Sequence, residues 1–234
     1  MQIYRDLNLK VISKEFISSN VIFLRVEPDR LLRYEAGQYF SFSIEPKVNR
    51  SYSVASAPGD EFIEFLIDVT NPGKGADFVR GLNENDSIVC IGPLGFFTLS
   101  KTNHENASQF LLVGTGTGIA PLRSMIRELL IYKQETRKII LYFGLRYGED
   151  MYLYDEFVEL QKKFPNFLFN MVISRPSDNW RGLTGYCQHH IGSDGIDLNT
   201  NVYICGSTKN VNSIKEHLIN IGCPKAKIFE EKYG

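Results

Sequence analysis

The sequence predicts two domains, an all-β first half followed by a second half with a doubly wound parallel sheet. Residues 9–99 hold short strand-like runs between Pro and Gly turns, as expected of an antiparallel barrel or sandwich, whereas residues 110–233 alternate strand-like with helix-like runs. The polar stretch SKTNHENASQ at 100–109 separates the halves. We therefore place the first domain at 1–100 and the second at 107–234.

The first half contains short runs with the β-branched and aromatic composition of strands. In order they are KVIS, NVIFLRVE, YFSFSIE, RSYSVAS, FIEFLIDV and SIVCIGP. Glu27-Pro28-Asp29, Asn71-Pro72-Gly73 and Gly92-Pro93 supply turns. Side chains two apart on a strand share a face, so Arg50 and Tyr52 point the same way. They form either a surface pair or a clamp for something flat and anionic.

The second half begins with the strand FLLVG and a helix that has one buried face. The helix follows from the spacing of its apolar residues, Leu122, Met125, Ile126, Leu129 and Leu130. The elements that follow are the strand KIILYFG, the helix YDEFVELQKKF, the strands FLFNMVIS and NVYICG, the helix VNSIKEHLINIG and the strand KIFEEKY. Strands alternating with helices indicate a parallel sheet.

Composition excludes several classes of function. The 26 Lys and Arg against 27 Asp and Glu give no case for nucleic-acid binding. Apolar runs are too short to cross a membrane, and MQIYRDLNLK has no signal-peptide pattern, so we expect a cytoplasmic protein without membrane insertion. Zinc, redox dithiol and iron–sulfur sites are not expected, because the cysteines are widely scattered: Cys90, Cys187, Cys205 and Cys223. The histidines also lack metal-ligand spacing.

The turn GTGTGIAP at 114–121 joins the first strand of the second half to its helix. Gly114, Gly116 and Gly118 let the backbone approach a phosphate, which the helix N-terminus attracts. A merely flexible turn is the alternative. The spacing G-x-G-x-G differs from both the G-x-G-x-x-G fingerprint and a Walker A loop, and the next strand ends in Arg146 where an NAD fold places an acid. An ATPase and an ordinary dehydrogenase are therefore disfavoured.

Five motifs occur in a characteristic order: R-x-Y-S at 50–53, GPLGFF at 92–97, GTGTGIAP, YICGS at 203–207 and a terminal EKY. Together they resemble the ferredoxin–NADP reductase superfamily over nearly the whole chain. The resemblance implies an antiparallel Greek-key β-barrel that binds FAD and a doubly wound α/β domain that binds NAD(P).

The resemblance assigns the flavin contacts to two segments. It implies that Tyr52 packs on the flavin ring, that Arg50 pairs with the phosphates and that Ser53 hydrogen-bonds near flavin N5. In NPGKGADF the pyrophosphate would lie at a helix N-terminus formed by Gly73, Lys74, Gly75 and Ala76. Because Ala76 replaces the family's small hydroxyl residue, backbone N–H groups would be the main donors. A cation–aromatic pair on the barrel wall and a solvated lysine are the alternatives.

The resemblance also implies a nicotinamide nucleotide site, with NADPH preferred and NADH possible. Ser174 and Arg175 match a pair that holds the 2′-phosphate in NADPH-selective relatives, with Arg181 close enough to join; a solvated loop is the alternative. The glycine-rich turn would hold the remaining phosphates, and its residues are Gly114, Thr115, Gly116, Thr117 and Gly118. We count Arg146 with this site.

The same resemblance places Cys205 beside the nicotinamide ring, with Gly206 leaving room for it. In the tail, Glu231 would hydrogen-bond near the reaction centre and Tyr233 would cover the flavin face. Ser53, Cys205 and Glu231 are thus the predicted catalytic residues. A small buried cysteine and an edge strand with an incidental tyrosine are the alternatives. Gly234 stands where relatives often have a further aromatic residue.

These inferences predict a flavoenzyme that moves hydride from NADPH to FAD and passes single electrons to a small redox protein, a ferredoxin or flavodoxin. An NAD(P)H:flavin reductase or the reductase component of an oxygenase is the nearest alternative. A regulator that binds flavin or nucleotide without catalysis belongs to a different class. No resident metal is expected.

Overall fold

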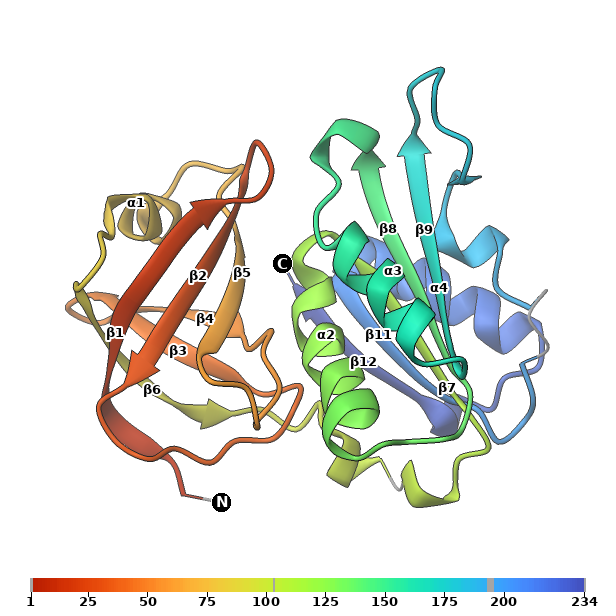
Figure 1. The fold of residues 1–234 in the computed structure, drawn as a ribbon, viewed down its shortest axis with the longest axis horizontal. Helices are drawn as coiled ribbons and strands as arrows, with labels where there is room; N and C mark the ends of the chain where they lie inside the picture. The colour runs from red at the N-terminus through yellow and green to blue at the C-terminus, as the bar shows by residue number, and fades with distance from the viewer. Residues whose placement is uncertain (1, 103, 193–195, 234) are drawn as a thin grey trace.

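The computed structural model of the chain describes residues 2–102, 104–192 and 196–233. It confirms the predicted fold class, with an antiparallel sheet in the first half and a parallel one in the second. Figure 1 shows the two parts side by side, with the C-terminus of the chain between them.

The first part is a barrel of six antiparallel strands in the order β4-β3-β6-β1-β2-β5. The late strand β6 lies between β3 and β1, which is a Greek-key arrangement. A bridge between Val54 and Phe65 joins the two outer strands. The bounds are β1 Tyr4–Phe16, β2 Val21–Pro28, β3 Tyr39–Glu45, β4 Val48–Ser53, β5 Ile63–Asp68, α1 Lys74–Gly81 and β6 Ser87–Leu94.

Alternate residues of these strands fill the barrel. Phe40, Phe42 and Phe65 are fully buried, and the Phe42 and Phe65 ring centroids lie 5.0 Å apart in an edge-on arrangement. In β1 the buried residues Leu7, Leu9 and Val11 keep a period of two. The sequence prediction of KVIS was too short for this strand, because the polar residues that alternate with these apolar ones hide its first half.

The second part is a parallel sheet in the order β10-β9-β8-β7-β11-β12. The strands are β7 Phe110–Thr115, β8 Ile139–Tyr147, β9 Phe167–Arg175, β10 Leu183–Thr184, β11 Asn201–Ser207 and β12 Ile228–Tyr233. The helices are α2 Ile119–Arg127, α3 Tyr154–Lys163 and α4 Thr208–Asn220. The winding reverses at β7, because β8 and β9 lie on one side of it and β11 and β12 on the other.

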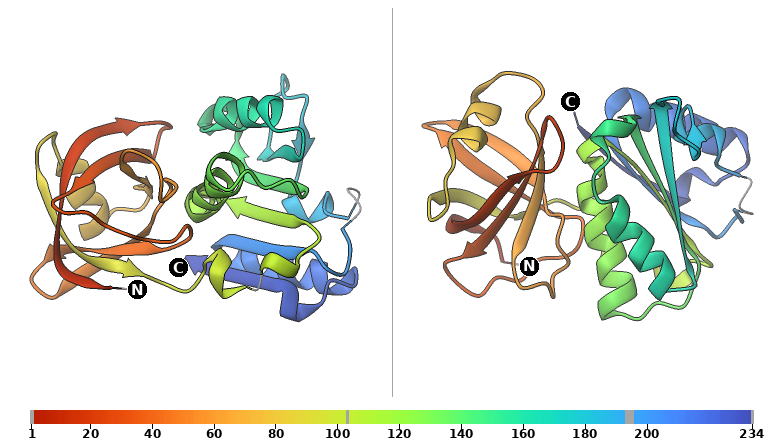
Figure 2. Two further views of the ribbon diagram at one scale, coloured as in Figure 1. Left: turned by 60° about the horizontal axis from the view of Figure 1, so that its bottom comes forward. Right: turned by 45° about the horizontal axis from the view of Figure 1, so that its top comes forward.

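The helices cover both faces of this sheet. Leu122 of α2 and Phe157 of α3 pack in one apolar cluster, and Val211 and Leu218 of α4 pack in another. Figure 2 shows α2 as the helix that faces the barrel. This helix was predicted to run on to Leu130, but a π-helical turn over Glu128–Tyr132 takes over after Arg127. Strand β10 was not predicted, because two residues give no periodicity.

Among the described residues, no helix is long and apolar enough to span a membrane. Those residues also include no group of three or more His, Cys, Asp or Glu side chains placed to hold a metal ion.

Candidate active site

The candidate site lies where the winding of the sheet reverses, at the carboxyl ends of β7 and β11. Open α/β sheets bind ligands at this kind of edge. In register across three strands, Cys205 of β11 lies between Gly114 of β7 and Glu231 of β12. The turn over Gly116–Gly118 leads directly from β7 into α2.

Two glycines allow the backbones of this turn and of β11 to approach each other closely. A Cβ atom on Gly118 would lie 2.4 Å from the Cys205 carbonyl oxygen. A Cβ atom on Gly206 would lie 2.1 Å from Thr115 Oγ1. Side chains at either position would therefore push the strands apart. Gly116 has φ +55, and a Cβ there would contact nothing within 4 Å, which leaves its backbone open to a ligand.

One hydrogen bond joins the end of the barrel strand β4 to the last strand of the sheet. The buried Ser53 donates through Oγ to Glu231 Oε1 over 2.9 Å, although the residues lie far apart in sequence. Burial raises the pKa of the Glu231 carboxyl, and the Ser53 hydrogen bond opposes that rise. Two of the three predicted catalytic residues, Ser53 and Glu231, are thus in direct contact.

Cys205 and Tyr233 complete this group. Cys205 is fully buried, and burial raises the pKa of its thiol, with a further contribution from the nearby Glu231 charge. The Tyr233 hydroxyl is buried next to Ser53 and Cys205. Burial raises its pKa, and Cys205 and Glu231 act in the same direction. Gly234 lies outside the described residues.

Tyr52, predicted to pack on the flavin ring, and Arg50, predicted to bind the flavin phosphates, lie together near the start of α1. A Cβ atom on Gly75 would lie 2.9 Å from the Tyr52 hydroxyl and 3.1 Å from Arg50 Cγ, so these side chains close over the start of α1. The Tyr52 ring centroid is 5.0 Å from that of Phe42, and burial raises the pKa of its phenol. Arg50 is exposed, and its Nη1 donates to the neighbouring Asn49 carbonyl.

Helix α1 begins after Gly73, with no side chain capping its first N–H groups. These groups remain available to an anion. Lys74, by contrast, already pairs with Glu45 at 2.6 Å. The Ala76 methyl packs against the barrel core, so this departure from the family pattern contributes packing in place of a hydroxyl donor.

Arg146, Ser174 and Arg175 lie together at the carboxyl ends of β8 and β9. Arg175 donates to the Tyr147 hydroxyl over 2.9 Å and lies 5.8 Å from that ring's centroid, which holds its guanidinium at the sheet edge. Arg181 instead donates to the carbonyls of Asp178 and Trp180 in its own loop. Its side chain is exposed and turned onto that loop.

The sequence pattern assigned no role to the polar residues of α2. Arg123 is 5% exposed and contacts carboxylates of both domains, Glu64 at 2.7 Å and Glu156 at 2.8 Å. Arg127 pairs with Asp60 at 2.8 Å. The sequence did show two arginines four residues apart, beside the apolar face of the predicted helix. Their partners lie on other elements, so the spacing of residues within the helix could not identify them.

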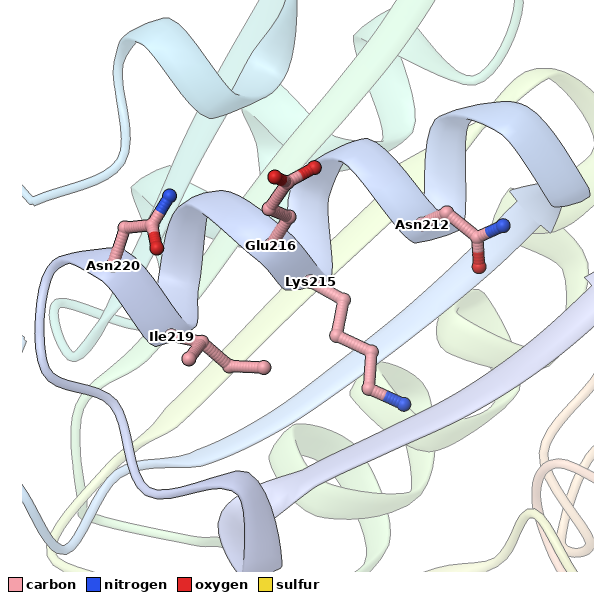
Figure 3. A pocket seen from close by; sticks show the side chains of 5 residues that line it. All are labelled: Asn212, Lys215, Glu216, Ile219 and Asn220. Atoms are coloured by element: carbon pink, nitrogen blue, oxygen red, sulfur yellow. The ribbon is translucent and has the colours of Figure 1, made fainter.

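A shallow depression on the outer face of α4 lies away from this site (Figure 3). It is lined by Asn212, Lys215, Glu216, Ile219 and Asn220, all from this one helix. Lys215 extends from the helix to pair with Glu230 of β12 at 2.9 Å. The depression therefore has an ion pair at its rim and no glycine-rich turn.

Two family models match separate parts of the chain. Residues 8–99 match the oxidoreductase FAD-binding domain, and residues 112–216 match the oxidoreductase NAD-binding domain. Ferredoxin–NADP reductase B of Sorangium cellulosum is 30% identical over 86% of this chain and 85% of its own length. The chain belongs to the ferredoxin–NADP reductase superfamily. This reductase is therefore an oxidoreductase whose cofactors are FAD and a nicotinamide nucleotide.

Other similar proteins carry the names of different reductases. The CDP-6-deoxy-L-threo-D-glycero-4-hexulose-3-dehydrase reductase of Yersinia pestis is 32% identical over 96% of this chain and 68% of its own. The cytochrome P450 reductase GcoB of Amycolatopsis has a TM-score of 0.89 at 26% identity, over 98% of this chain and 70% of that one. A component of the Na⁺-translocating NADH-quinone reductase of Neisseria meningitidis is 28% identical, but the chain spans only 53% of its length.

Proposed function

We propose that this reductase takes hydride from NADPH onto FAD and delivers electrons singly to a small redox protein, a ferredoxin or flavodoxin. The observation that carries the proposal is the contact of Ser53 with Glu231 beside Cys205, because it brings the end of the barrel strand to the reversal point of the nucleotide-binding sheet. FAD, when bound, supplies the exchange of a hydride for two single electrons.

The residues present fit a flavin nucleotide. The Tyr52 phenol and Arg50 stem close over Gly75, where only a residue without a Cβ leaves space. In this proposal, the Arg50 guanidinium and the uncapped N–H groups of α1 bind the pyrophosphate. Lys74 adds little charge, because Glu45 neutralises it.

At the reaction centre we assign positioning and proton handling to this chain's own residues. Ser53 Oγ donates to Glu231 Oε1, and the raised pKa of Glu231 keeps its carboxyl protonated to higher pH than an exposed glutamate would be. Cys205 stays a neutral thiol, because burial raises its pKa, and fills space beside the nicotinamide. Tyr233 excludes water from the same place.

The glycine-rich turn and Arg175 bind the nucleotide in this proposal. The turn presents backbone N–H groups at the start of α2, and Gly206 keeps β11 close to it. Arg175, oriented by Tyr147, is the residue that favours the 2′-phosphate of NADPH. Arg146 adds positive charge at the same edge of the sheet.

The proposed electron acceptor is a ferredoxin or a flavodoxin. The name of the Sorangium relative supports ferredoxin, and this chain covers most of that relative's length. A reductase component for an oxygenase or a dehydrase is the second candidate, supported by the names of the Amycolatopsis and Yersinia relatives. Both candidates pass electrons to another protein, and neither releases free reduced flavin.

The test is the absorption spectrum of the purified protein before and after anaerobic addition of NADPH, followed by turnover with a ferredoxin, a flavodoxin and free FMN. We expect a yellow protein that bleaches with NADPH and reduces the protein carriers faster than free FMN. Fast FMN reduction with idle carriers would instead support a flavin reductase. Bound flavin that NADPH does not bleach would support a regulator.

A further inference from the structure

The strongest feature outside the proposed site is a cluster of buried and half-buried charges between the two domains, which we call the interdomain joint. Its residues are Asp60 and Glu64 of the barrel, Arg123 and Arg127 of α2, and Glu156 of α3. Helix α2 is the element that faces the barrel (Figure 2). Both arginines contact carboxylates of each domain.

Arg123 lies at the centre of the joint. Its Nη1 donates to the Glu64 carboxylate over 2.7 Å and to the Ala55 carbonyl over 2.9 Å, both in the barrel. Its Nε donates to the Glu156 carboxylate over 2.8 Å, in its own domain. The guanidinium also lies 5.6 Å from the Phe23 ring centroid. A planar fork with fixed donor directions can satisfy all of these partners, whereas a lysine ammonium cannot.

Arg127, one turn later, repeats the pattern. Its Nε and Nη2 each donate to the Asp60 carboxylate over 2.8 Å. Its Nη1 donates to the Glu156 carboxylate over 3.1 Å. Asp60 also accepts from the Tyr132 hydroxyl and the Ala57 N–H, each over 2.7 Å. Between these arginines, Ser124 donates to the Ser56 carbonyl. Bidentate pairs of this kind fix orientation as well as distance.

The joint lies next to both halves of the candidate site along the chain. Its barrel contacts, Ala55, Ser56 and Asp60, directly follow β4, which carries Arg50, Tyr52 and Ser53. Its helix contacts lie one to two turns after the glycine-rich turn. A tilt of α2 against the segment 55–60 would therefore move the nucleotide turn relative to the flavin strand.

We propose that Arg123 is a positioning residue for hydride transfer, which holds the nucleotide domain against the flavin domain at the separation the reaction needs. This inference rests on the proposed function for its rate effect, but not for its effect on domain geometry. An error of about 1 Å in the approach of reacting groups can cost about 10²-fold in rate.

The matched control is Arg137, whose hydrogen-bond partners lie in the nucleotide domain and in the connecting stretch 100–109, and not in the barrel. Its Nε binds Glu135 over 2.9 Å, its Nη1 binds the Ala107 carbonyl over 2.8 Å, and its guanidinium lies 4.7 Å from the Phe110 ring centroid. Arg137→Met therefore removes comparable contacts without removing any contact between α2 and the barrel. It should lower thermal stability and leave the interdomain geometry unchanged.

The separation of the two domains is measured by pulsed electron–electron double resonance. One spin label is attached at Glu27→Cys in β2 and the other at Asn212→Cys in α4. Both positions are exposed, and Asn212 points outward from its helix in Figure 3. The native cysteines are buried and would resist labelling. We expect Arg123→Met to broaden the distance distribution, Arg123→Lys to broaden it less, and Arg137→Met to keep it narrow.

The rate is measured by stopped-flow bleaching of the flavin band at saturating NADPH in the FAD-loaded protein. We expect Arg123→Met to lose about 10²-fold in the reduction rate, with FAD affinity and the KM for NADPH changed less than about threefold, and Arg123→Lys to recover part of the rate. If Arg123→Met does not fold, Glu64→Gln replaces it in both measurements. We then expect the same broadening of the distance distribution and the same loss in the reduction rate.

Two results would overturn the inference: a narrow distance distribution with an unchanged rate in Arg123→Met, or an equal rate loss in Arg137→Met. Failure of the wild-type flavin to bleach would overturn the proposed function. In that case the distance measurement alone would still decide whether Arg123 fixes the domains.

Discussion

At the scale of single residues, the two basic residues near the flavin-phosphate site are not equivalent. Arg50 donates to one local carbonyl, whereas Lys74 is paired with Glu45. We predict that Arg50→Ala weakens FAD binding by about 1.5–3 kcal/mol, because a charge-assisted bond is lost. Lys74→Ala, the control, should have a smaller effect. Titration of the apoprotein with FAD checks both, and equal losses would contradict the assignment.

Arg175 and Arg181 offer a similar contrast for the nucleotide. Arg175 is held by Tyr147, while Arg181 binds carbonyls of its own loop. We predict that Arg175→Ala raises the KM for NADPH and leaves that for NADH and both kcat values nearly unchanged, since uniform binding is lost. Arg181→Ala should change little. Steady-state kinetics with both nucleotides test this, and a parallel rise in both KM values would refute it.

Cys205 tests whether the sheet edge is the nicotinamide site. It lies in register between Gly114 and Glu231, far along the chain from the flavin-phosphate residues. We predict that Cys205→Ala slows flavin reduction while FAD stays bound. Stopped-flow bleaching reports the rate, and the bound flavin absorbance reports occupancy. An unchanged rate would leave Cys205 as a buried residue of the core.

At the scale of elements, local patterns were predictable and long-range contacts were not. The runs of strands and helices, the glycine-rich turn and the R-x-Y-S strand are set within a few neighbouring residues, so the sequence indicated them. Arg123 and Glu64 meet only because α2 packs on the barrel, and no spacing within α2 encodes that partner. The pairing of Lys74 with Glu45 likewise depends on how α1 lies beside β3.

The ends of elements were also hard to predict, for a physical reason. Strand β4 ends at Ser53, yet the predicted run continued to Ser56, because Val54 continues the alternation set by Tyr52. In the structure the Ala55 and Ser56 carbonyls bind α2 instead of a strand. The roles of the predicted site residues stay predictions, although the structure brings Ser53, Cys205, Glu231 and Tyr233 together.

At the scale of the whole molecule, the domains share apolar as well as charged contacts. Val21, Phe23 and Leu66 of the barrel pack in the same cluster as Leu122 and Met125 of α2. Burial of this surface favours association but is not directional. The ion pairs of the interdomain joint, in contrast, fix the orientation of one domain relative to the other. The apolar contacts therefore favour association of the domains, and the ion pairs set its geometry.

The joint should make the stability of the whole chain sensitive to acid. Burial alone would raise the pKa of Asp60, but hydrogen bonds from Arg127, Tyr132 and the Ala57 N–H lower it overall. A carboxyl with a depressed folded-state pKa contributes stability above its unfolded pKa of about 3.9, and that contribution is lost as the pH falls through the folded value. The charge of Asp60 therefore contributes fully to the stability of the folded protein at neutral pH, and contributes nothing at strongly acidic pH.

We predict that Asp60→Asn destabilises the protein at pH 7 by about 1–3 kcal/mol, because Arg127 keeps its charge and loses a carboxylate partner. The difference from wild type should shrink as the pH falls below about 4. Urea unfolding of both proteins between pH 7 and pH 3 measures it. Asp77→Asn is the control, because Asp77 is exposed and its ion pair lies within a single helix. Its Oδ1 is 3.6 Å from Arg80 Nη1, and both residues belong to α1. A pH-independent cost of Asp60→Asn would show that its charge contributes nothing to holding the domains together.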